Sequence, residues 1–272
     1  MSIDLELVTR ARSGDRHAIE GVVRESTDLV FNLAVRMLGD RTDAEDCTQE
    51  ILVRVVNGLG SFRGDSSFRT WVYRVASNYL LTARKRLTEQ RIDSFDKLEG
   101  NLDAGIAADL PPPDDAVLLT EAKLTCTAFM LLGLDREQRL AFVLGEILDL
   151  SSEEGADVLG ITPEAFRKRL SRARDRMTEF TTRRCGLVDE ANPCRCGKQV
   201  AKTYAEGHMK PPEAYFVTLS VRSTDRTVPY LEKIDRLQRA VAVLRGHPEY
   251  AAPAALVDGV RKLMETGRME AG

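Results

Sequence analysis

Apolar residues recur at helical spacing along most of the chain. The stretches LVFNLAVRML (29–38) and ILVRVVNGL (51–59) place them three or four positions apart, with Gly/Asp turns between such runs. This spacing is typical of amphipathic helices that bury one face. It covers about residues 5–87 and again 115–184, whereas residues 88–113 are acidic and end in three prolines.

These patterns predict an all-α fold made of two small helical domains, an acidic linker without a core of its own, and a mostly helical C-terminal extension. The expected boundaries are residues 1–90 for the first domain, 91–114 for the linker, 115–184 for the second domain and 185–272 for the extension. No internal repeat is found.

The stretch DAEDCTQE (43–50) concentrates four carboxylates within eight residues. Thr42 with Glu45 three positions later fits a capping box, which predicts that a helix begins here. At about 100° per residue, one stripe of this helix is apolar and consists of Ala44, Cys47, Ile51 and Val55. A nearly opposite face carries Asp43, Asp46 and Glu50. The helix therefore presents a focused negative patch.

Four uses of this patch are open from the residues alone: a metal site, acid–base catalysis, a solvated surface, or docking onto a basic partner. Catalytic carboxylates face a cleft with supporting groups. The nearest histidine is His17, and no His-Glu metal motif accompanies the patch. A metal or catalytic role is therefore disfavoured. A solvated surface and docking onto a basic partner remain.

Composition and charge narrow the class of protein. Charged residues make up 30% of the 272 residues and aromatic residues 6%, which favours helical modules over a β-sandwich. The net charge of −3 hides three blocks of charge. Residues 62–86 hold six basic residues and one acidic, 93–115 seven acidic and one basic, and 161–185 eight basic and three acidic.

Cellular location also follows from the sequence pattern. No apolar run approaches the roughly 20 residues of a membrane span, and no signal pattern opens the chain. We therefore expect a cytoplasmic protein without membrane insertion. In that compartment its five cysteines are expected to be thiols or metal ligands rather than disulfides.

The segment FRTWVYRVASNYLLTARKR (68–86) combines basic and aromatic side chains and fits single-stranded nucleic acid. Its cations suit phosphates: Arg69, Arg74, Arg84, Lys85 and Arg86. Aromatic faces for stacked or flipped bases come from Phe62, Phe68, Trp71 and Tyr73. The alternative is that Trp71 lies on a core stripe with Val75 and only packs.

Residues 135–178 predict a helix-turn-helix with a basic second helix. Ser151 with Glu154 forms a capping box, and Gly160 makes the turn. Thr162 then caps a helix whose first residue is Pro163. That helix is expected to bury Phe166, Leu170 and Ala173 and to present Arg167, Lys168, Arg169, Arg172 and Arg174. The alternative is a merely solvated basic face.

The order LGD…DAED..QE…FRGDSSFRTW.YR.A.N…R resembles region two of bacterial sigma factors, in particular the extracytoplasmic-function (ECF) group. The helix-turn-helix segment resembles sigma region four, and together the two resemblances cover about residues 5–184. One departure from the family pattern lies in the helix-turn-helix segment. The family usually has GTVKSRL where this chain has EAFRKRL (164–170), so no DNA sequence preference carries over.

The resemblance implies a non-enzymatic initiation factor that needs no cofactor for this role. Its implied partners are core RNA polymerase, through the largest-subunit clamp and the flap, promoter DNA, and an anti-sigma factor. The acidic helix would bind the clamp through Asp43, Glu45, Asp46, Gln49 and Glu50. The acidic linker would mimic nucleic acid in the polymerase channel, with an unstructured surface as the alternative.

The resemblance also implies two sets of DNA contacts. The loop 62–67 would capture a flipped base of the minus-ten element, and Asn78 is the leading candidate for a base contact. The full minus-ten set is Phe62, Arg63, Asp65, Ser66, Arg69, Trp71, Tyr73, Arg74, Asn78 and Arg84. The minus-thirty-five set is Thr162, Glu164, Arg167, Lys168, Arg169, Ser171, Arg172 and Arg174.

The C-terminal extension lies outside the resemblance. Three thiols with an imidazole would suit zinc or another metal, and the candidate ligands are Cys185, Cys194, Cys196 and His208. A redox-responsive thiol cluster and simple packing are the alternatives, and Cys47 and Cys126 are expected in the core. The segment YFVTLSV (215–221) is a candidate extended piece, with helices expected around 231–244 and 254–264. We hypothesise that these helices fold back on the sigma domains as a regulator.

Two other functional classes compete with an initiation factor. A stand-alone helix-turn-helix regulator would bind duplex DNA without polymerase, but it gives no reason for the DAED..QE helix. A metal-dependent nuclease would use the carboxylates, but it lacks a second ligand set. The sequence therefore favours a promoter-specificity subunit of RNA polymerase.

Overall fold

The computed structural model describes residues 4–84, 87–108, 111, 116–205 and 249–265. All of the regular elements in these ranges are helices, which confirms the expected all-α fold. The one pairing of strand type within them is an isolated bridge between Cys185 and Cys194. No helix in the described part of the chain is long and apolar enough to cross a membrane.

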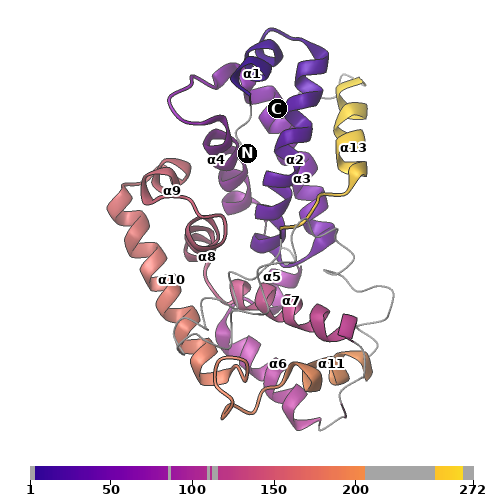
Figure 1. Cartoon of the computed structure of the whole chain (residues 1–272), viewed down its shortest axis with the longest axis vertical. Coiled ribbons are helices and arrows are strands. Elements are labelled where there is room, and N and C mark those ends of the chain that lie inside the picture. The colour runs from indigo at the N-terminus through magenta and orange to yellow at the C-terminus, as the bar shows by residue number, and fades with distance from the viewer. Residues whose placement is uncertain (1–3, 85–86, 109–110, 112–115, 206–248, 266–272) are drawn as a thin grey trace.

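The first unit is a small helical bundle (Figure 1). Its elements are α1 (Leu5–Arg12), α2 (Arg16–Leu38), α3 (Arg41–Gly58), the short η1 (Leu59–Ser61) and α4 (Phe68–Thr82). Helices α2 and α3 form a hairpin, because Gly39 ends α2 with a left-handed φ of 66°. The expected start of α3 at Thr42 is wrong. Asp40 is its N-cap and accepts from Asp43 N at 2.9 Å, so the helix begins two residues earlier.

The acidic stretch after the first unit is helical and packed. It forms α5 (Leu87–Arg91) and α6 (Phe95–Ala107), and Leu98 and Leu102 on α6 are buried. Ser94 caps α6, and its two buried leucines lie one turn apart, so the helix has an apolar stripe of its own. The expectation of a linker without a core is therefore wrong for this stretch.

Charge on α6 is met by neighbouring cations rather than left to solvent. Glu99 and Asp103 form ion pairs with Arg183 and Arg184 near the end of α10 (Pro163–Arg184). The rings of Phe95 and Phe180 lie 4.7 Å apart and tie the same two helices together. The acidic block thus packs against a basic block of the same chain.

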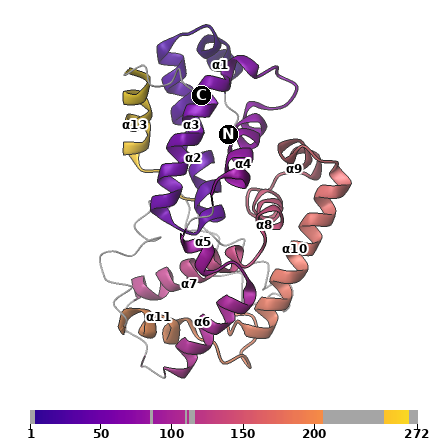
Figure 2. The same ribbon diagram turned by 180° about the vertical axis from the view of Figure 1, so that it is seen from behind.

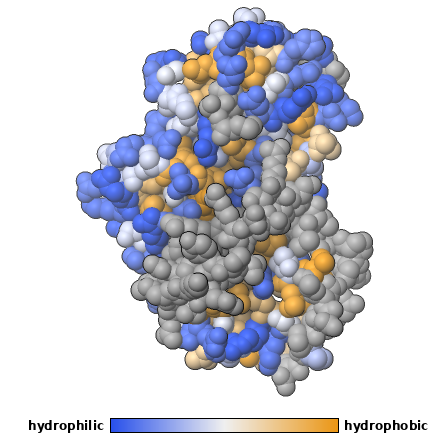
Figure 3. All heavy atoms as spheres, in the orientation of Figure 1, coloured by the Kyte–Doolittle hydropathy of each residue, from blue (hydrophilic) through white to orange (hydrophobic). Residues whose placement is uncertain are grey.

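The second unit carries the helix-turn-helix. Its elements are α7 (Ala116–Leu132), α8 (Arg136–Phe142), the π-helical turn η2 (Val143–Ile147), α9 (Ser152–Leu159) and α10. The capping box of Ser151 and Glu154 is present, and Gly160 makes the turn in the left-handed region. Thr162 caps α10, whose first residue is Pro163. Hydrophilic residues dominate the surface over α9 and the start of α10 (Figure 3).

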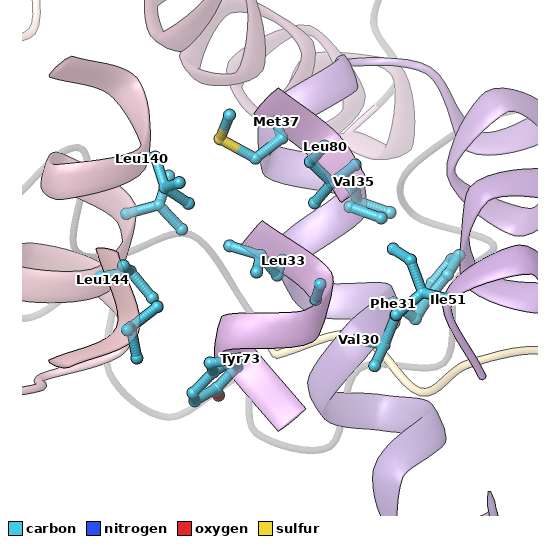
Figure 4. Close-up of a cluster of buried hydrophobic side chains, with 14 of the residues drawn as sticks. Val30, Phe31, Leu33, Val35, Met37, Ile51, Tyr73, Leu80, Leu140 and Leu144 are labelled. Atoms are coloured by element: carbon cyan, nitrogen blue, oxygen red, sulfur yellow. The ribbon is translucent and has the colours of Figure 1, made fainter. Parts of the chain in front are cut away.

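One hydrophobic core runs through both units. Leu140 and Leu144 of the second unit point toward Leu33 and Met37 of α2, with Tyr73 of α4 beside them (Figure 4). The α4 helix also lies against α9. Because burying each large apolar side chain contributes about 1.5–3 kcal/mol, this shared core holds the units together.

A buried ion-pair network reinforces this junction. Glu89, with 1% of its side chain exposed, pairs with Arg136 at 2.6 Å and Arg139 at 3.0 Å. Arg139 also donates to the carbonyl oxygens of Leu132, at 3.2 Å, and of Met37. Burial alone would raise the pKa of Glu89, but hydrogen bonds and charge from the two arginines lower it overall. The junction therefore contains a carboxylate that is ionised at neutral pH.

The C-terminal part of the chain returns to the first unit. Helix α13 (Ala254–Glu265) lies along α2 and α3, as both Figures 1 and 2 show. The helix expected around residues 254–264 is therefore confirmed. The extended piece expected at 215–221 and the helix expected around 231–244 lie outside the described residues.

Candidate polymerase and nucleic-acid interfaces

Helix α3 separates its apolar and acidic faces as its sequence predicts. Ala44, Cys47, Ile51 and Val55 are fully buried. On the other side Asp46 and Glu50 are exposed, and Glu50 pairs with Arg54 at 2.9 Å. Glu45 and Asp43 are half-buried, and Glu45 pairs with Arg41 at 2.6 Å. This face of α3 therefore carries two exposed and two half-buried carboxylates.

Three residues of the expected minus-ten set, Phe62, Trp71 and Tyr73, are buried in the core of this structure, as the packing alternative for Trp71 predicts. The rings of Phe62 and Phe68 lie 5.1 Å apart, and Trp71 stacks on Phe68 at 5.3 Å with only 8% of its surface exposed. Tyr73 is buried too, with the Arg69 guanidinium 5.4 Å from its ring. The rings pack on one another because burying these large apolar surfaces against each other is lower in free energy than exposing them to water.

The remaining minus-ten candidates lie on the surface. Arg63 and Asp65 of the loop before α4 are exposed, and Ser66 is half-buried. Asn78 and Arg84 are exposed on α4 and just beyond its end. These side chains are free to approach a strand, unlike the ring cluster beneath them. Lys85 and Arg86 lie outside the described residues.

Two cations of α4 are engaged by the second unit. Arg74 forms an ion pair with Asp157 of α9, and its Nε donates to the Asp157 carbonyl at 3.0 Å. Arg69 donates to the Leu148 carbonyl at 3.4 Å. This face of α4 is therefore covered by the helix-turn-helix unit. This pairing could not be predicted from the sequence, because Asp157 is simply one acidic residue of a short amphipathic helix.

Helix α10 presents its basic face much as predicted. Phe166, Leu170 and Ala173 are buried, which fixes the opposite face outward. The exposed members of the minus-thirty-five set are Thr162, Glu164, Arg167, Lys168, Ser171, Arg172 and Arg174. Some of their charges already have partners within the chain.

Those partners are acidic residues of α8, η2, α9 and α10, and the longest of these pairs joins Arg167 to Glu153 of α9 at 4.0 Å. Half-buried Arg169 pairs with Glu137 at 3.0 Å, and Lys168 pairs with Glu164 at 2.8 Å. Arg174 pairs with the buried Glu146. Arg174 is therefore tied to the structure of its own unit, whereas Arg172 faces outward among exposed neighbours.

Comparison with known proteins now decides the family. The profile of Sigma-70 region 2 matches residues 22–90, and that of Sigma-70 region 4 matches residues 125–177. The chain is 32% identical over 178 residues to the RNA polymerase sigma-H factor of Pseudomonas aeruginosa, covering 63% of this chain and 90% of that protein. It is 31% identical over 171 residues to the ECF RNA polymerase sigma factor SigW of Bacillus subtilis, covering 62% and 91%. The chain belongs to the ECF sigma factors.

A solved structure was also found for comparison. It is the structure of CnrH in complex with the cytosolic domain of CnrY, with 23% sequence identity and a TM-score of 0.44. It covers 62% of this chain and 91% of that chain.

As an ECF sigma factor, the protein is a non-enzymatic transcription initiation factor that binds core RNA polymerase and promoter DNA and needs no cofactor for that role. Residues 178–272 lie beyond the two matched regions. The last cysteines and α13 therefore belong to a part of this sigma factor that the family profiles do not describe.

Four cysteines of this sigma factor line one apolar cavity of about 60 Å³: Cys126, Cys185, Cys194 and Cys196. Cys126 comes from α7 in region four, and the other three surround the turn between α10 and α11 (Cys196–Ala205). The turn is held by Asn192, which donates to the carbonyls of Thr182 at 2.9 Å and Cys185 at 3.1 Å. Cys126 was not predicted to join the other three cysteines, because its apolar helical context indicated only packing.

Burial raises the pKa of all four thiols. For Cys196 the pKa rises to about 11, and the neighbouring thiols add to the burial effect at Cys126. Among the described residues, no group of three or more His, Cys, Asp or Glu side chains is arranged to hold a metal ion. The candidate ligand His208 lies outside the described residues.

Proposed function

We propose that this sigma factor docks on the polymerase clamp through the acidic face of α3, with Asp43, Glu45, Asp46, Gln49 and Glu50 as the contact residues. The observation that carries this proposal is the division of α3 into a fully buried apolar stripe and an exposed carboxylate face. A focused negative face suits a basic partner and gives orientation as well as attraction. The protein would act in the cytoplasm, where it meets polymerase.

Promoter contacts are proposed for side chains that can reach DNA. For the minus-ten element these are Arg63, Asp65, Ser66, Asn78 and Arg84, joined by Arg69 and Arg74 once α4 is uncovered. For the minus-thirty-five element they are the exposed residues of α10 and its N-cap, with Arg172 as the outward phosphate contact. Lys and Arg contacts to phosphate supply salt-dependent affinity, whereas base edges supply specificity.

Reading both elements together requires the two units to separate. The elements lie roughly 25 base pairs apart, which at about 3.4 Å per pair is about 85 Å of duplex. In this structure α4 and α9 are in contact through Arg74 and Asp157. We infer that the described conformation precedes promoter binding and that it opens before both readers engage DNA and the minus-ten region melts.

The docking proposal is tested by measuring the affinity of the full chain for core RNA polymerase. Asp46→Ala/Glu50→Ala should weaken binding at least ten-fold at low salt, and the difference should shrink as salt rises because exposed charges are screened. Glu153→Ala/Glu164→Ala, which removes two exposed charges from the second unit, is the matched control. Equal weakening by both pairs would reject α3 as the specific docking face.

We also propose that the cysteine cavity makes the C-terminal extension responsive to a thiophilic metal ion such as zinc. The meeting of Cys126 with the three cysteines of residues 185–196 in one cavity supports this proposal, with Cys126 in place of His208 as the fourth ligand. In the described structure the four sulfurs are not arranged as a metal site, and thiolate ligands lie about 2.3 Å from zinc. Binding would therefore draw the four sulfurs together and release their protons.

Cobalt(II) titration of the reduced full chain tests the metal proposal, because four thiolates around this ion give an intense charge-transfer absorption. The signal should appear in the wild type and in His208→Ala, and should be lost in Cys126→Ser. No signal in any form, with a disulfide formed by hydrogen peroxide instead, would replace the metal proposal by the redox alternative.

A further inference from the structure

The C-terminal segment is anchored on α2 by polar contacts that lie deep in the molecule. Asn32 Nδ2 donates to the Tyr250 carbonyl at 2.6 Å, and the Tyr250 amide donates to Asn32 Oδ1 at 2.8 Å. The Ala252 amide donates to Asp28 Oδ1 at 2.9 Å. The reciprocal pair fixes the register of this segment along α2, because both hydrogen bonds need the same alignment.

The Tyr250 side chain covers a buried charge. The Arg36 guanidinium lies 5.6 Å from the centre of the Tyr250 ring, and both side chains are almost completely buried. Burial lowers the pKa of Arg36 and raises that of Tyr250. A buried guanidinium gains hydration when its cover leaves. The hydrogen bonds to Asn32 therefore hold this segment in place, whereas the burial of the Arg36 charge beneath Tyr250 favours its release.

Helix α13 follows this anchor and packs on α2 and α3 with one apolar side. Leu256 and Val260 are buried in the main core, whereas Ala255 and Lys262 are exposed on the outer side. Arg261 Nε lies 3.8 Å from Glu20 Oε1 at the start of α2, and Arg261 Nη1 lies 3.3 Å from Asp258 Oδ1 of α13 itself. Helix α13 is thus packed against α2 and α3 through its apolar side.

Helix α13 meets a residue of the proposed polymerase-docking set. A Cβ added to Gly259 would lie 3.2 Å from Gln49 Nε2, so the backbone of α13 is almost in contact with the Gln49 side chain. A helix with its side chains is about 10–12 Å across. Any partner helix that approaches Gln49 along α3 would therefore collide with α13. Asp46 and Glu50 remain exposed beside it.

We propose that α13 is a built-in competitor for the polymerase-docking surface of α3, so that core polymerase binds tightly only after α13 leaves. This inference rests on the proposed docking role of α3. The exposed carboxylates would allow a first electrostatic encounter, and displacement of α13 would complete the interface. The apparent affinity then falls with the fraction of molecules in which α13 is undocked.

The test compares core-polymerase affinity among full-length variants. Leu256→Asp/Val260→Asp places two charges against the core and should release α13. We expect it to bind core polymerase at least ten-fold more tightly than the wild type. Ala255→Asp/Lys262→Ala makes the same change in net charge on the exposed side of α13 and should bind as the wild type does. Circular dichroism and thermal unfolding establish that each variant is folded.

A charge-swap series provides a second test in case Leu256→Asp/Val260→Asp does not fold. Arg261→Glu alone should strengthen polymerase binding by a few fold, and adding Glu20→Arg should restore the wild-type value. Unchanged affinity in both the folded release variant and Arg261→Glu would overturn the competitor proposal. Adding Asp46→Ala/Glu50→Ala to the release variant keeps the two proposals apart. If this combined variant loses binding, α3 is supported as the docking face. If it still binds as tightly as the release variant, α3 is rejected as that face.

Discussion

Two faces of sigma region two that we propose to bind DNA and polymerase are each partly covered in this structure, but by different kinds of contact. The α4 face meets α9 through the ion pair of Arg74 and Asp157, whose side chains are 39% and 40% exposed. The α2–α3 face meets α13 through buried Leu256 and Val260. The α4–α9 contact adds a half-exposed ion pair to the buried side chains of the shared core, whereas the α13 contact combines apolar burial with buried hydrogen bonds.

This difference indicates how each face becomes available. Exposed ion pairs contribute about 0–1 kcal/mol and weaken with salt, so a polyanion such as DNA can compete for Arg74. Apolar burial is not weakened by charge screening, and a partner that offers comparable apolar contacts is needed to displace it. The ion pair over the proposed DNA-binding face of α4 is therefore expected to break readily, although separating the units must also expose part of the shared core. The proposed polymerase-docking face of α3 is expected to open only in exchange for polymerase.

The largest expected effect concerns the buried ion-pair network that joins the two units in the described conformation. Glu89→Ala removes the partner of buried Arg139 and should lower the free energy of unfolding by about 3–5 kcal/mol. Chemical denaturation measures this difference. Glu99→Ala, which breaks the more exposed pair with Arg183, should cost less than about 1 kcal/mol. Similar losses in the two variants would contradict a dominant role for the buried network.

Acid should remove the Glu89 contribution. Its folded-state pKa is lowered from the ordinary value of 4.5. The contribution is therefore complete above the unfolded-state pKa and is lost as pH falls through the lower folded-state pKa. The stability difference between wild type and Glu89→Ala should shrink over that acidic window. A difference that stays constant with pH would show that Glu89 acts through packing alone.

The next effect sharpens the description of the α13 contact. Leu256→Ala should weaken the docking of α13 by about 2 kcal/mol, as expected for a truncated buried leucine. Limited proteolysis of residues 249–265 measures the undocked fraction. The effect should be the same at low and high salt, because no charge is removed. A strong salt dependence would contradict the apolar character of this contact.

The smallest effect concerns the ion pair of the α4–α9 contact. A double-mutant cycle of Arg74→Ala and Asp157→Ala should give a coupling energy of about 0.2–1 kcal/mol at low salt. The coupling should disappear as the screening length falls from about 30 Å to 3 Å. Denaturation of the four proteins at each salt concentration supplies the cycle. A coupling that persists at high salt would make this contact a fixed part of the fold.

Local pattern was enough to predict the elements that depend on nearby residues. The buried stripe of α3, the turn at Gly160 and the cap at Thr162 follow from spacing and side-chain chemistry over a few positions. The start of α3 was misplaced because Asp40 and Thr42 both fit a cap. The order in residues 95–107 was missed because acidic composition hid the spacing of two leucines.

Features set by tertiary structure could not be read in the same way. Aromatic residues beside arginines suit both a core and a stacked base, so only the packing of Phe62, Trp71 and Tyr73 separates the two. The encounter of Cys126 with the later cysteines joins segments far apart in sequence. The approach of Gly259 to Gln49 likewise depends on how the chain returns to its first unit.

Hydrogen exchange of the full chain with and without core RNA polymerase tests the central claim most directly. If α3 docks on polymerase in exchange for α13, binding should keep the amides of Arg41–Gly58 protected while those of Ala254–Glu265 exchange faster. Unchanged or increased protection of Ala254–Glu265 in the complex would contradict the account, because α13 would then remain where polymerase is proposed to bind.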